Sequence, residues 1–517
     1  MRWSHPDDSL RQIAFWLKAV IGTSFAVDDV NHAALSGRYR MLVSSRRDFL
    51  RQVLASSAFV GSARLALHGQ SLDPAIRDFV LTARDADVTV APGRTWRTWT
   101  YDGQVPGPLI RVRQGERLRL RLVNELPEPT TIHWHGIPVP NAMDGVSGLT
   151  QEPAPPGGSF RYEFAVQTPG TYLYHSHHGL QMDRGLVGPL VVDPADTTQE
   201  PAFDREYVLV LDDWLTTTPE AALTQLRQAG SMGGGMMGGM GAGMMGGSDG
   251  PASGGYLVNG ALTAGATPLR VRRGERVRVR LINSASSTTF RVGLPSHRLL
   301  VTHSDGQPIQ PVTVDTLPIG MGERYDVVVS ADSPGTYPLL VGPLDSSVPG
   351  VVVPFVYDGY SDRLVAPTVW PSTLLRGRTL RLQDLAALTV RETVDIPNRV
   401  VRLQLGQAMM GSYVWTINGQ AYPNADPISV AEGEHIRFAI TNGTMMRHPI
   451  HLHGHFFRVR GTAGGDSYAP LKDTVLVEPM GSTVEFDAHM DNPGRWFLHC
   501  HHLYHMEAGM ARVVEYR

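Results

Sequence analysis

Cysteine is almost absent from this sequence: Cys500 is the only cysteine in 517 residues. A single cysteine excludes a disulfide within the chain, so cysteine usage gives no indication of export to an oxidising compartment. The one thiol lies between two histidines, His499 and His501. This placement indicates a metal site, because thiolate and imidazole are both metal ligands.

The sequence also lacks a strong charge of either sign and a long amphipathic helical pattern. Its formal net charge is −3, which argues against a nucleic acid or another polyanion as partner. Glycine and proline are abundant, with 54 and 37 residues, and favour an all-β protein with many turns. A chain of this length is expected to form about three domains.

The N-terminal region contains a predicted export signal. The run SRRDFL at residues 45–50 resembles the twin-arginine signal, and an apolar stretch at residues 53–60 follows it. That stretch is too short to span a bilayer. We therefore expect a periplasmic protein exported by the twin-arginine pathway, with residues 1–71 forming an N-terminal extension and signal. An ordinary basic helix start is the alternative, and Met41 is an alternative start to Met1.

Three internal repeats follow the signal. Each repeat has a Gly-Glu pair, an alternating polar and apolar run, and an asparagine nine residues after the glycine. The glycine and asparagine pairs are Gly115 and Asn124, Gly274 and Asn283, and Gly433 and Asn442. The glycines are 159 residues apart in both intervals, and the alternating runs predict half-buried strands. We expect three similar β-sandwich or barrel domains at residues 72–198, 203–365 and 375–517.

Histidine pairs occur in the first and third repeats, and the equivalent positions of the second repeat have none. A His-x-His pair on a strand places both rings on one face. The four pairs are His133 and His135, His175 and His177, His451 and His453, and His499 and His501. We therefore expect the metal site where the first and third domains meet, with the second domain as a spacer or wall.

The run HCHHLYHMEAGM at residues 499–510 contains a thiolate, imidazoles and a thioether, the ligands of a blue copper site. On a strand, Cys500 would face one way while His499 and His501 face the other. One tripeptide could then contact two separate metal sites. His448 and His505 remain as ligands for the cysteine site. The alternative is a buried cysteine among chance histidines.

The motifs HWHG, HSH, HxxHxH and HCHxxxHxxxxM, in this order, resemble those of the multicopper oxidases over nearly the whole mature chain. The runs at residues 140–145, 444–449 and 505–510 are most similar to bacterial laccases and periplasmic copper-resistance oxidases. The resemblance implies three consecutive cupredoxin-like Greek-key domains, an all-β fold and four copper ions. It also implies that four one-electron oxidations of a substrate are coupled to the reduction of O2 to two waters.

The resemblance further implies a set of copper ligands. The type 1 ligands would be His448, Cys500, His505 and Met510. The type 2 ligands would be His133 and His451. One type 3 copper would bind His135, His175 and His501, and the other would bind His177, His453 and His499. The histidines beside these motifs, which the resemblance leaves as outer groups or surface residues, are His178, His455 and His502.

Two further roles follow from the same resemblance. Cys500 would pass electrons to His499 and His501, and Asp144 would help to deliver protons near the type 2 copper. The alternative for Asp144 is an ordinary Asp-Gly turn. Some bacterial relatives have a glutamate directly after the second type 1 histidine, but here that residue is Met506 and Glu507 comes next.

The second domain carries a Met/Gly-rich segment, SMGGGMMGGMGAGMMGG at residues 231–247. So much glycine argues against a fixed fold, and thioethers suit Cu(I). The segment is either a Cu(I)-capturing element or a plain linker. Its methionines are Met232, Met236, Met237, Met240, Met244 and Met245.

The expected partners are O2 and a small reducing substrate, which would be a phenol, Cu(I) or both. A copper-sequestering or copper-tolerance protein without significant turnover is the alternative, and so is a relative of the fold that has lost its copper. The complete set of ten histidines with Cys500 argues against both, because storage needs no such arrangement.

Overall fold

The computed structural model describes residues 75–517, except residues 199, 233–249, 392–395 and 409–411. The predicted export signal and nearly all of the Met/Gly-rich segment therefore lie outside the described residues. The described chain forms six β-sheets with few helices, as the composition predicted. None of the described helices is long and apolar enough to span a membrane.

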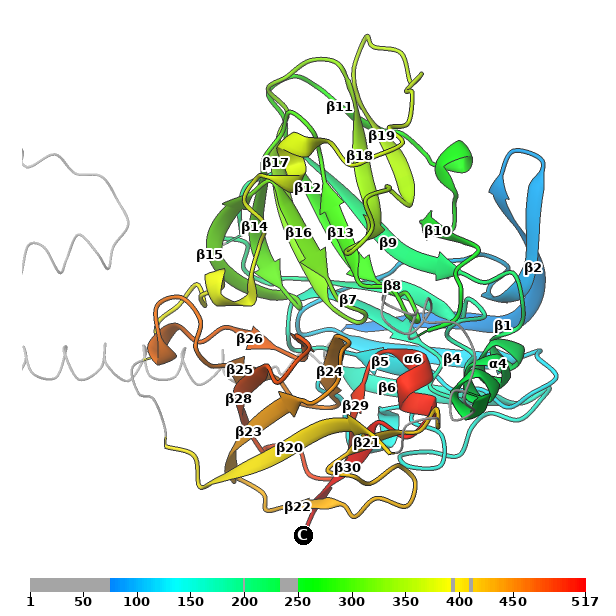
Figure 1. Cartoon of the computed structure of the whole chain (residues 1–517), viewed down its shortest axis with the longest axis vertical. Coiled ribbons are helices and arrows are strands. Elements are labelled where there is room, and N and C mark those ends of the chain that lie inside the picture. The colour runs from blue at the N-terminus through cyan, green and yellow to red at the C-terminus, as the bar shows by residue number, and fades with distance from the viewer. Residues whose placement is uncertain (1–74, 199, 233–249, 392–395, 409–411) are drawn as a thin grey trace, which may run out of the picture. The chain divides into compact units, whose positions relative to one another are not determined.

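The first domain consists of two four-stranded sheets (Figure 1). The first sheet contains, in spatial order, β2 (Arg94–Tyr101), β1 (Ile76–Ala91), β4 (Arg117–Asn124) and β6 (Ser159–Ala165). The second contains β3 (Ile110–Arg113), β8 (Val187–Asp193), β7 (Gly170–His175) and β5 (His133–His135). In β4 the leucines at 118, 120 and 122 are fully buried and the residues between them are more exposed, which confirms the predicted alternation.

The second domain has a six-stranded and a five-stranded sheet. The larger contains β10 (Gly255–Val258), β9 (Arg205–Trp214), β12 (Arg276–Asn283), β17 (Arg324–Ser330), β14 (Leu299–Ser304) and β15 (Gln307–Val314). The smaller contains β11 (Leu269–Val271), β19 (Val351–Tyr357), β18 (Thr336–Pro343), β13 (Phe290–Gly293) and β16 (Thr316–Ile319). The helix α4 (Pro219–Met232) reaches two residues into the Met/Gly-rich segment, and α5 (Ser372–Leu375) follows the sheets.

The third domain repeats the six-plus-five arrangement. One sheet contains β21 (Trp415–Ile417), β20 (Arg399–Gln407), β23 (His435–Asn442), β28 (Thr483–His489), β25 (Phe457–Val459) and β26 (Leu471–Lys472). The other contains β22 (Ile428–Val430), β30 (Ala511–Tyr516), β29 (Arg495–Cys500), β24 (His448–Leu452) and β27 (Thr474–Val477), and the helix α6 (Leu503–Glu507) follows β29. The 3-10 helices are η1 (Asn141–Met143), η2 (Thr263–Gly265), η3 (Leu382–Asp384) and η4 (Asp466–Tyr468).

The three repeats share one topology. The strand after each Gly-Glu pair is parallel to the first long strand of its repeat, as in β1 and β4, β9 and β12, and β20 and β23. The last strand of each repeat is likewise parallel to a short strand of its sheet, as in β3 and β8, β11 and β19, and β22 and β30. Each repeat is therefore a sandwich of two sheets, and each sheet contains one such parallel pair of strands.

The repeated residues have a structural cause. Each glycine has a positive φ, between 78° and 89°, which a residue with a side chain adopts only with strain. The following glutamate accepts a backbone N–H, as in Arg113 N to Glu116 Oε2 at 2.7 Å. Each asparagine is fully buried and its side chain bridges the loop that follows the strand. Asn283, for example, donates to the carbonyls of Thr288 and Ile319 and accepts the N–H of Ala285.

Candidate metal centre

Cys500, the last residue of β29, lies in a small buried site with two histidines. His448 comes from β24 and His505 from α6, and all three side chains are fully buried. The Nδ1 atoms of His448 and His505 lie 3.5 Å and 3.8 Å from the sulfur. Three ligand atoms from separate elements therefore converge on one point, as a metal site requires.

The surroundings of this site fix its ligands. The Nε2 atom of His448 is hydrogen-bonded to Thr444 Oγ1 at 2.8 Å, which leaves Nδ1 directed at the sulfur. Met510 is fully buried, and its carbonyl accepts the Cys500 N–H at 3.0 Å. Burial raises the pKa of the Cys500 thiol well above its usual range and lowers the pKa of His448 to about 3. Forming the thiolate here requires a nearby positive charge, which a bound metal ion supplies.

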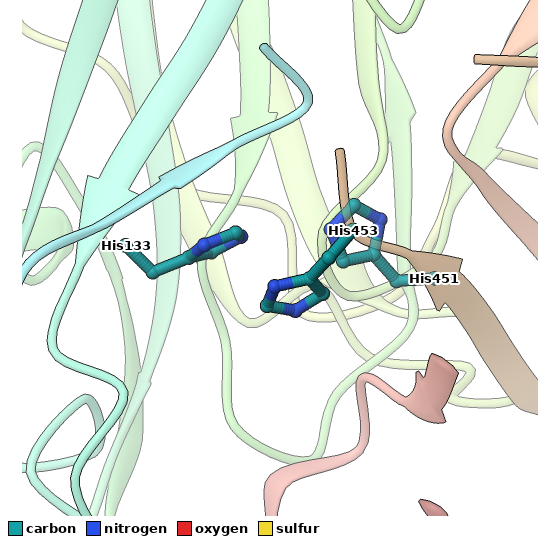
Figure 2. Close-up of side chains that lie close together, drawn as sticks. All are labelled: His133, His451 and His453. Carbon is teal, nitrogen blue, oxygen red and sulfur yellow. The ribbon is translucent and has the colours of Figure 1, made fainter. Parts of the chain in front are cut away.

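A second cluster contains eight histidines from the first and third domains. They lie on β5, β7, β24 and β29 or within two residues after these strands, and none is more than 8% exposed. The members are His133, His135, His175, His177, His451, His453, His499 and His501. Figure 2 shows His133 of the first domain facing His451 and His453 of the third, and the rings of His133 and His453 stack at 3.9 Å.

In three histidines of this cluster, one ring nitrogen has a hydrogen-bond partner in the protein and, within the part of the chain that the structure describes, the other has none. His133, His175 and His451 each donate Nδ1 to a backbone carbonyl, of Asp144, Ser176 and Asp473 respectively, at 2.8–3.0 Å. The Nε2 atom of each has no hydrogen-bond partner among the described residues. Metal-binding histidines have this pattern, with one nitrogen oriented by the protein and the other available to the metal.

Burial disfavours the charged form of several of these rings. It lowers the pKa of His175 and His499 to about 3, and it lowers the pKa of His135, His177 and His501 well below the usual value. Neighbouring histidines add to the effect, because a second positive charge in the cluster is unfavourable. A neutral imidazole is the form that binds a metal, so the chemistry of this cluster fits copper.

The groups of histidines whose ligand atoms lie close together overlap with the copper-ligand sets expected from the sequence. The ligand atoms of His177, His453 and His499 lie within 4.8 Å of one another, as expected for one type 3 set. His133 and His451, the expected type 2 pair, converge together with His453. His135 and His175 converge with His133 rather than with His501. The ring of His501 is still near, with its centroid 4.8 Å from that of His135.

Two carboxylates flank the cluster. Asp144 is 1% exposed, and its Oδ2 lies 3.0 Å from His453 Nδ1 while its Oδ1 lies 3.2 Å from His133 Nδ1. Asp473, which sequence reasoning missed, places its Oδ1 3.2 Å from His135 Nε2. No histidine motif contains Asp473. In the structure Asp473 directly precedes β27, the strand that pairs with β24, and only this pairing brings it beside the histidines.

The three histidines outside the motifs differ from one another. His455 is buried and bonded to Tyr516 Oη at 2.7 Å. His502 is also buried, and its ring stacks on that of His505 with centroids 3.6 Å apart. His178 is half-buried and bonded to Ser147 Oγ at 2.9 Å. His455 and His502 are therefore interior residues rather than surface groups.

A cavity of about 460 Å³ reaches the cysteine site from outside. His502 and His505 form part of its wall, together with the methionines Met321, Met445 and Met446. Gly250, the first described residue after residue 249, also lines it. A small molecule in the cavity would lie next to His505, whose side chain is itself fully buried.

The sequence and the fold are similar to those of known proteins. Three family profiles described as multicopper oxidase match residues 82–197, 205–351 and 396–517. The multicopper oxidase MmcO of Mycobacterium tuberculosis is 38% identical over 435 residues, 81% of this chain and 83% of that protein. Copper resistance protein A of Escherichia coli is 29% identical, over 92% of this chain and 99% of its own. The solved laccase of Botrytis aclada is 28% identical, with a TM-score of 0.69, over 85% of this chain and 88% of its own.

The likeness to MmcO extends over most of both chains, and the three profiles together cover most of the described residues. The predicted fold of three cupredoxin-like domains is confirmed by these structural and sequence relatives. They do not favour the alternative of a sequestering protein without turnover. The chain belongs to the multicopper oxidases and is a copper-dependent oxidoreductase that transfers electrons from its substrate to O2.

Proposed function

We propose that this oxidase holds four copper ions in two separate sites. The observation that supports this most directly is the division of buried ligands into a cysteine site and a histidine cluster. The type 1 site takes His448, Cys500, His505 and Met510. The type 2 ion takes His133 and His451, and the type 3 pair takes His135, His175 and His501 on one side and His177, His453 and His499 on the other. The copper ions, when bound, supply the one-electron chemistry and the binding of O2.

The chain itself links the two sites. Cys500 is joined by peptide bonds to His499 and His501, whose rings belong to the histidine cluster. His499 Nδ1 also donates to the Cys500 carbonyl at 2.9 Å. The covalent bonds within residues 499–501 form a short path from the cysteine sulfur to the cluster, and this hydrogen bond offers a second route. His505 borders the cavity, and its ring is the part of the cysteine site that a substrate can approach.

Asp144 is the proposed proton-holding residue of the cluster. Its carboxylate lies between His133 and His453 and is almost fully buried. The His453 ring N–H holds Oδ2, while Oδ1 has no hydrogen-bond partner among the described residues and is available to relay a proton close to the place where O2 is reduced. Glu507 is partly buried, and burial raises its pKa, but within the described residues no hydrogen bond or ion pair links it to the cluster.

We also propose three cupredoxin domains at residues 72–198, 203–365 and 375–517, and a periplasmic location reached through Arg46 and Arg47. The names of two relatives, a copper resistance protein and a laccase, support Cu(I) or phenols as substrates. Replacement of both arginines by lysine is expected to keep the protein out of the periplasm. Unchanged periplasmic fractionation of that variant would rule out twin-arginine export.

The Met/Gly-rich segment is proposed to collect Cu(I) for the cavity beside His505. Deletion of residues 231–247 is then expected to lower oxygen consumption with Cu(I) and to spare consumption with a phenol, at matched copper content. Equal losses on both substrates would indicate damage to the fold. An unchanged rate with Cu(I) would leave the segment as a linker.

The substrate class is best tested by oxygen uptake with Cu(I), a phenol and Fe(II), with and without excess Cu(II). Turnover of Cu(I), a phenol or both is expected, together with an intense blue Cys–Cu absorption band. A copper-loaded protein without turnover on any of the three would support the sequestering alternative.

A further inference from the structure

Arg324 of the second domain lies at the junction of all three domains, although its domain supplies none of the proposed ligands. Its side chain is fully buried. Nη1 and Nη2 donate to the two carboxylate oxygens of Asp473 in the third domain, at 2.7 Å and 2.5 Å. Nε donates to the carbonyl of Thr171 in the first domain at 3.1 Å. One guanidinium therefore joins the three domains directly behind the histidine cluster.

Asp473 and its neighbour Thr474 contact two histidines of that cluster. Asp473 Oδ1 lies 3.2 Å from His135 Nε2 and accepts the Thr474 hydroxyl at 2.8 Å. Thr474 Oγ1 lies 3.1 Å from both His135 Nε2 and His451 Nδ1. The Nδ1 atom of His135 has no partner among the described residues. The protein orients this ring through Nε2, and so through Asp473 and Thr474.

The stack of His135 on His451, with centroids 3.8 Å apart, therefore depends on where the Asp473 carboxylate points. A buried carboxylate needs partners that compensate its charge, and a cation that pairs with both of its oxygens also fixes its orientation. The guanidinium fork of arginine matches both carboxylate oxygens, whereas a lysine ammonium is a single point charge. Arg324 supplies this fork.

The surrounding charges hold Arg324 in place. Asp305 accepts the Arg324 backbone N–H at 3.0 Å and also accepts the Thr474 N–H at 3.2 Å. Lys472 contacts Asp305 and Glu323 at 3.0 Å and 3.1 Å. The neighbouring charges raise the pKa of Arg324 above its usual value, so it stays protonated. Contacts from both the second and the third domain thus fix the position of the guanidinium.

We propose that Arg324 is a positioning residue of the trinuclear site, which acts through Asp473 and Thr474 to orient His135 and His451. The second domain is then a working part of the oxygen-reducing site rather than a spacer or wall. This inference rests on the proposed assignment of His135 and His451 as copper ligands.

The matched control is Arg278, another buried arginine of the second domain. It is 2% exposed, and it bonds Asp326 and Glu200 through Nη2 and Nη1 at 2.5 Å and 2.7 Å. Within the described residues it makes no hydrogen bond or ion pair with any of the eight histidines. Arg278→Lys therefore removes a buried guanidinium that pairs with carboxylates but does not contact Asp473, Thr474 or the histidines. Thr474→Val is a milder second variant, because it removes the hydroxyl and leaves the Arg324–Asp473 pair intact.

The first measurement is the copper content of purified protein dialysed against a weak chelator, with the blue band and the type 2 electron paramagnetic resonance signal recorded on the same sample. Arg324→Lys is expected to keep the blue band and to hold the other copper ions about 10- to 100-fold more weakly. Arg278→Lys is expected to match the parent protein in both signals. Full copper content with an unchanged type 2 signal in Arg324→Lys, or an equal loss in Arg278→Lys, would overturn the inference.

The second measurement uses the copper-free protein. The ring ¹H–¹⁵N resonances of His135 and His451 are expected to shift in Arg324→Lys and in Thr474→Val, but not in Arg278→Lys. Unshifted rings in both of the first two variants would contradict the positioning role. If the parent protein itself shows no type 2 signal at full loading, the proposed four-copper function is wrong, whatever the variants do.

Discussion

At the scale of single residues, the candidate site is built from buried side chains, and four of its histidines are each held by a hydrogen bond at one ring nitrogen. Thr444 holds His448, and backbone carbonyls hold His133, His175 and His451. The strand period predicted that Cys500 and its two flanking histidines would serve different sites. The ring nitrogen that each histidine presents could not be predicted, because it depends on acceptors such as Asp473 that are distant in sequence.

The axial position is tested by Met510→Leu. A weak thioether ligand stabilises oxidised copper relative to a non-coordinating side chain. The variant is therefore expected to keep the blue band and to have a higher type 1 reduction potential, measured by redox titration. An unchanged or lower potential would argue that Met510 is not the ligand.

The buried carboxyl of Asp183 predicts a pH dependence of stability. Burial raises its pKa to about 7, whereas the unfolded chain has an ordinary aspartate pKa near 4. Between these values the folded protein binds the proton more tightly than the unfolded protein. The free energy of unfolding therefore falls as pH rises through this window, by up to about 1.4 kcal/mol per pH unit.

Asp183→Asn keeps an acceptor for the Tyr504 hydroxyl and removes the titrating group. Urea unfolding of both proteins at several values between pH 4 and pH 7 is expected to give a flatter profile for the variant. Parallel profiles would show that Asp183 does not titrate in this range. Asp212, whose pKa is also raised by burial, contributes to the slope that both proteins share.

At the scale of elements, the Gly-Glu and asparagine positions recur because each closes a turn or a loop at the ends of the same strand. The sequence pattern predicted these strands well, since alternation and turn residues are local signals. It gave no indication of α4, and it could not place β24 beside β29, because that pairing joins segments about fifty residues apart.

Asn283→Ala tests this element in a domain that has none of the proposed ligands. The change leaves the N–H of Ala285 and the carbonyls of Thr288 and Ile319 without their side-chain partner. Each buried group left unsatisfied costs about 1–3 kcal/mol. A lower melting temperature is therefore expected, with the blue band intact below it. An unchanged melting temperature would show that the loop finds other partners.

At the scale of the whole molecule, the histidine cluster lies where the first and third domains meet, and the second domain contributes the charged side chain of Arg324 beside it. The junction of the first and third domains was predictable, because histidine pairs occur in those two repeats alone. The contribution of Arg324 was not, because a buried ion pair between residues 149 positions apart has no local pattern.

The central claim is that Cys500 belongs to one copper site and its flanking histidines to another. The most direct test is Cys500→Ser, with visible absorption, copper content and electron paramagnetic resonance recorded on one sample. The blue band and oxidase activity are expected to disappear, while the type 2 signal and the histidine-bound copper remain. A Cys500→Ser protein that stays blue, or a folded one that loses the histidine-bound copper as well, would contradict this claim.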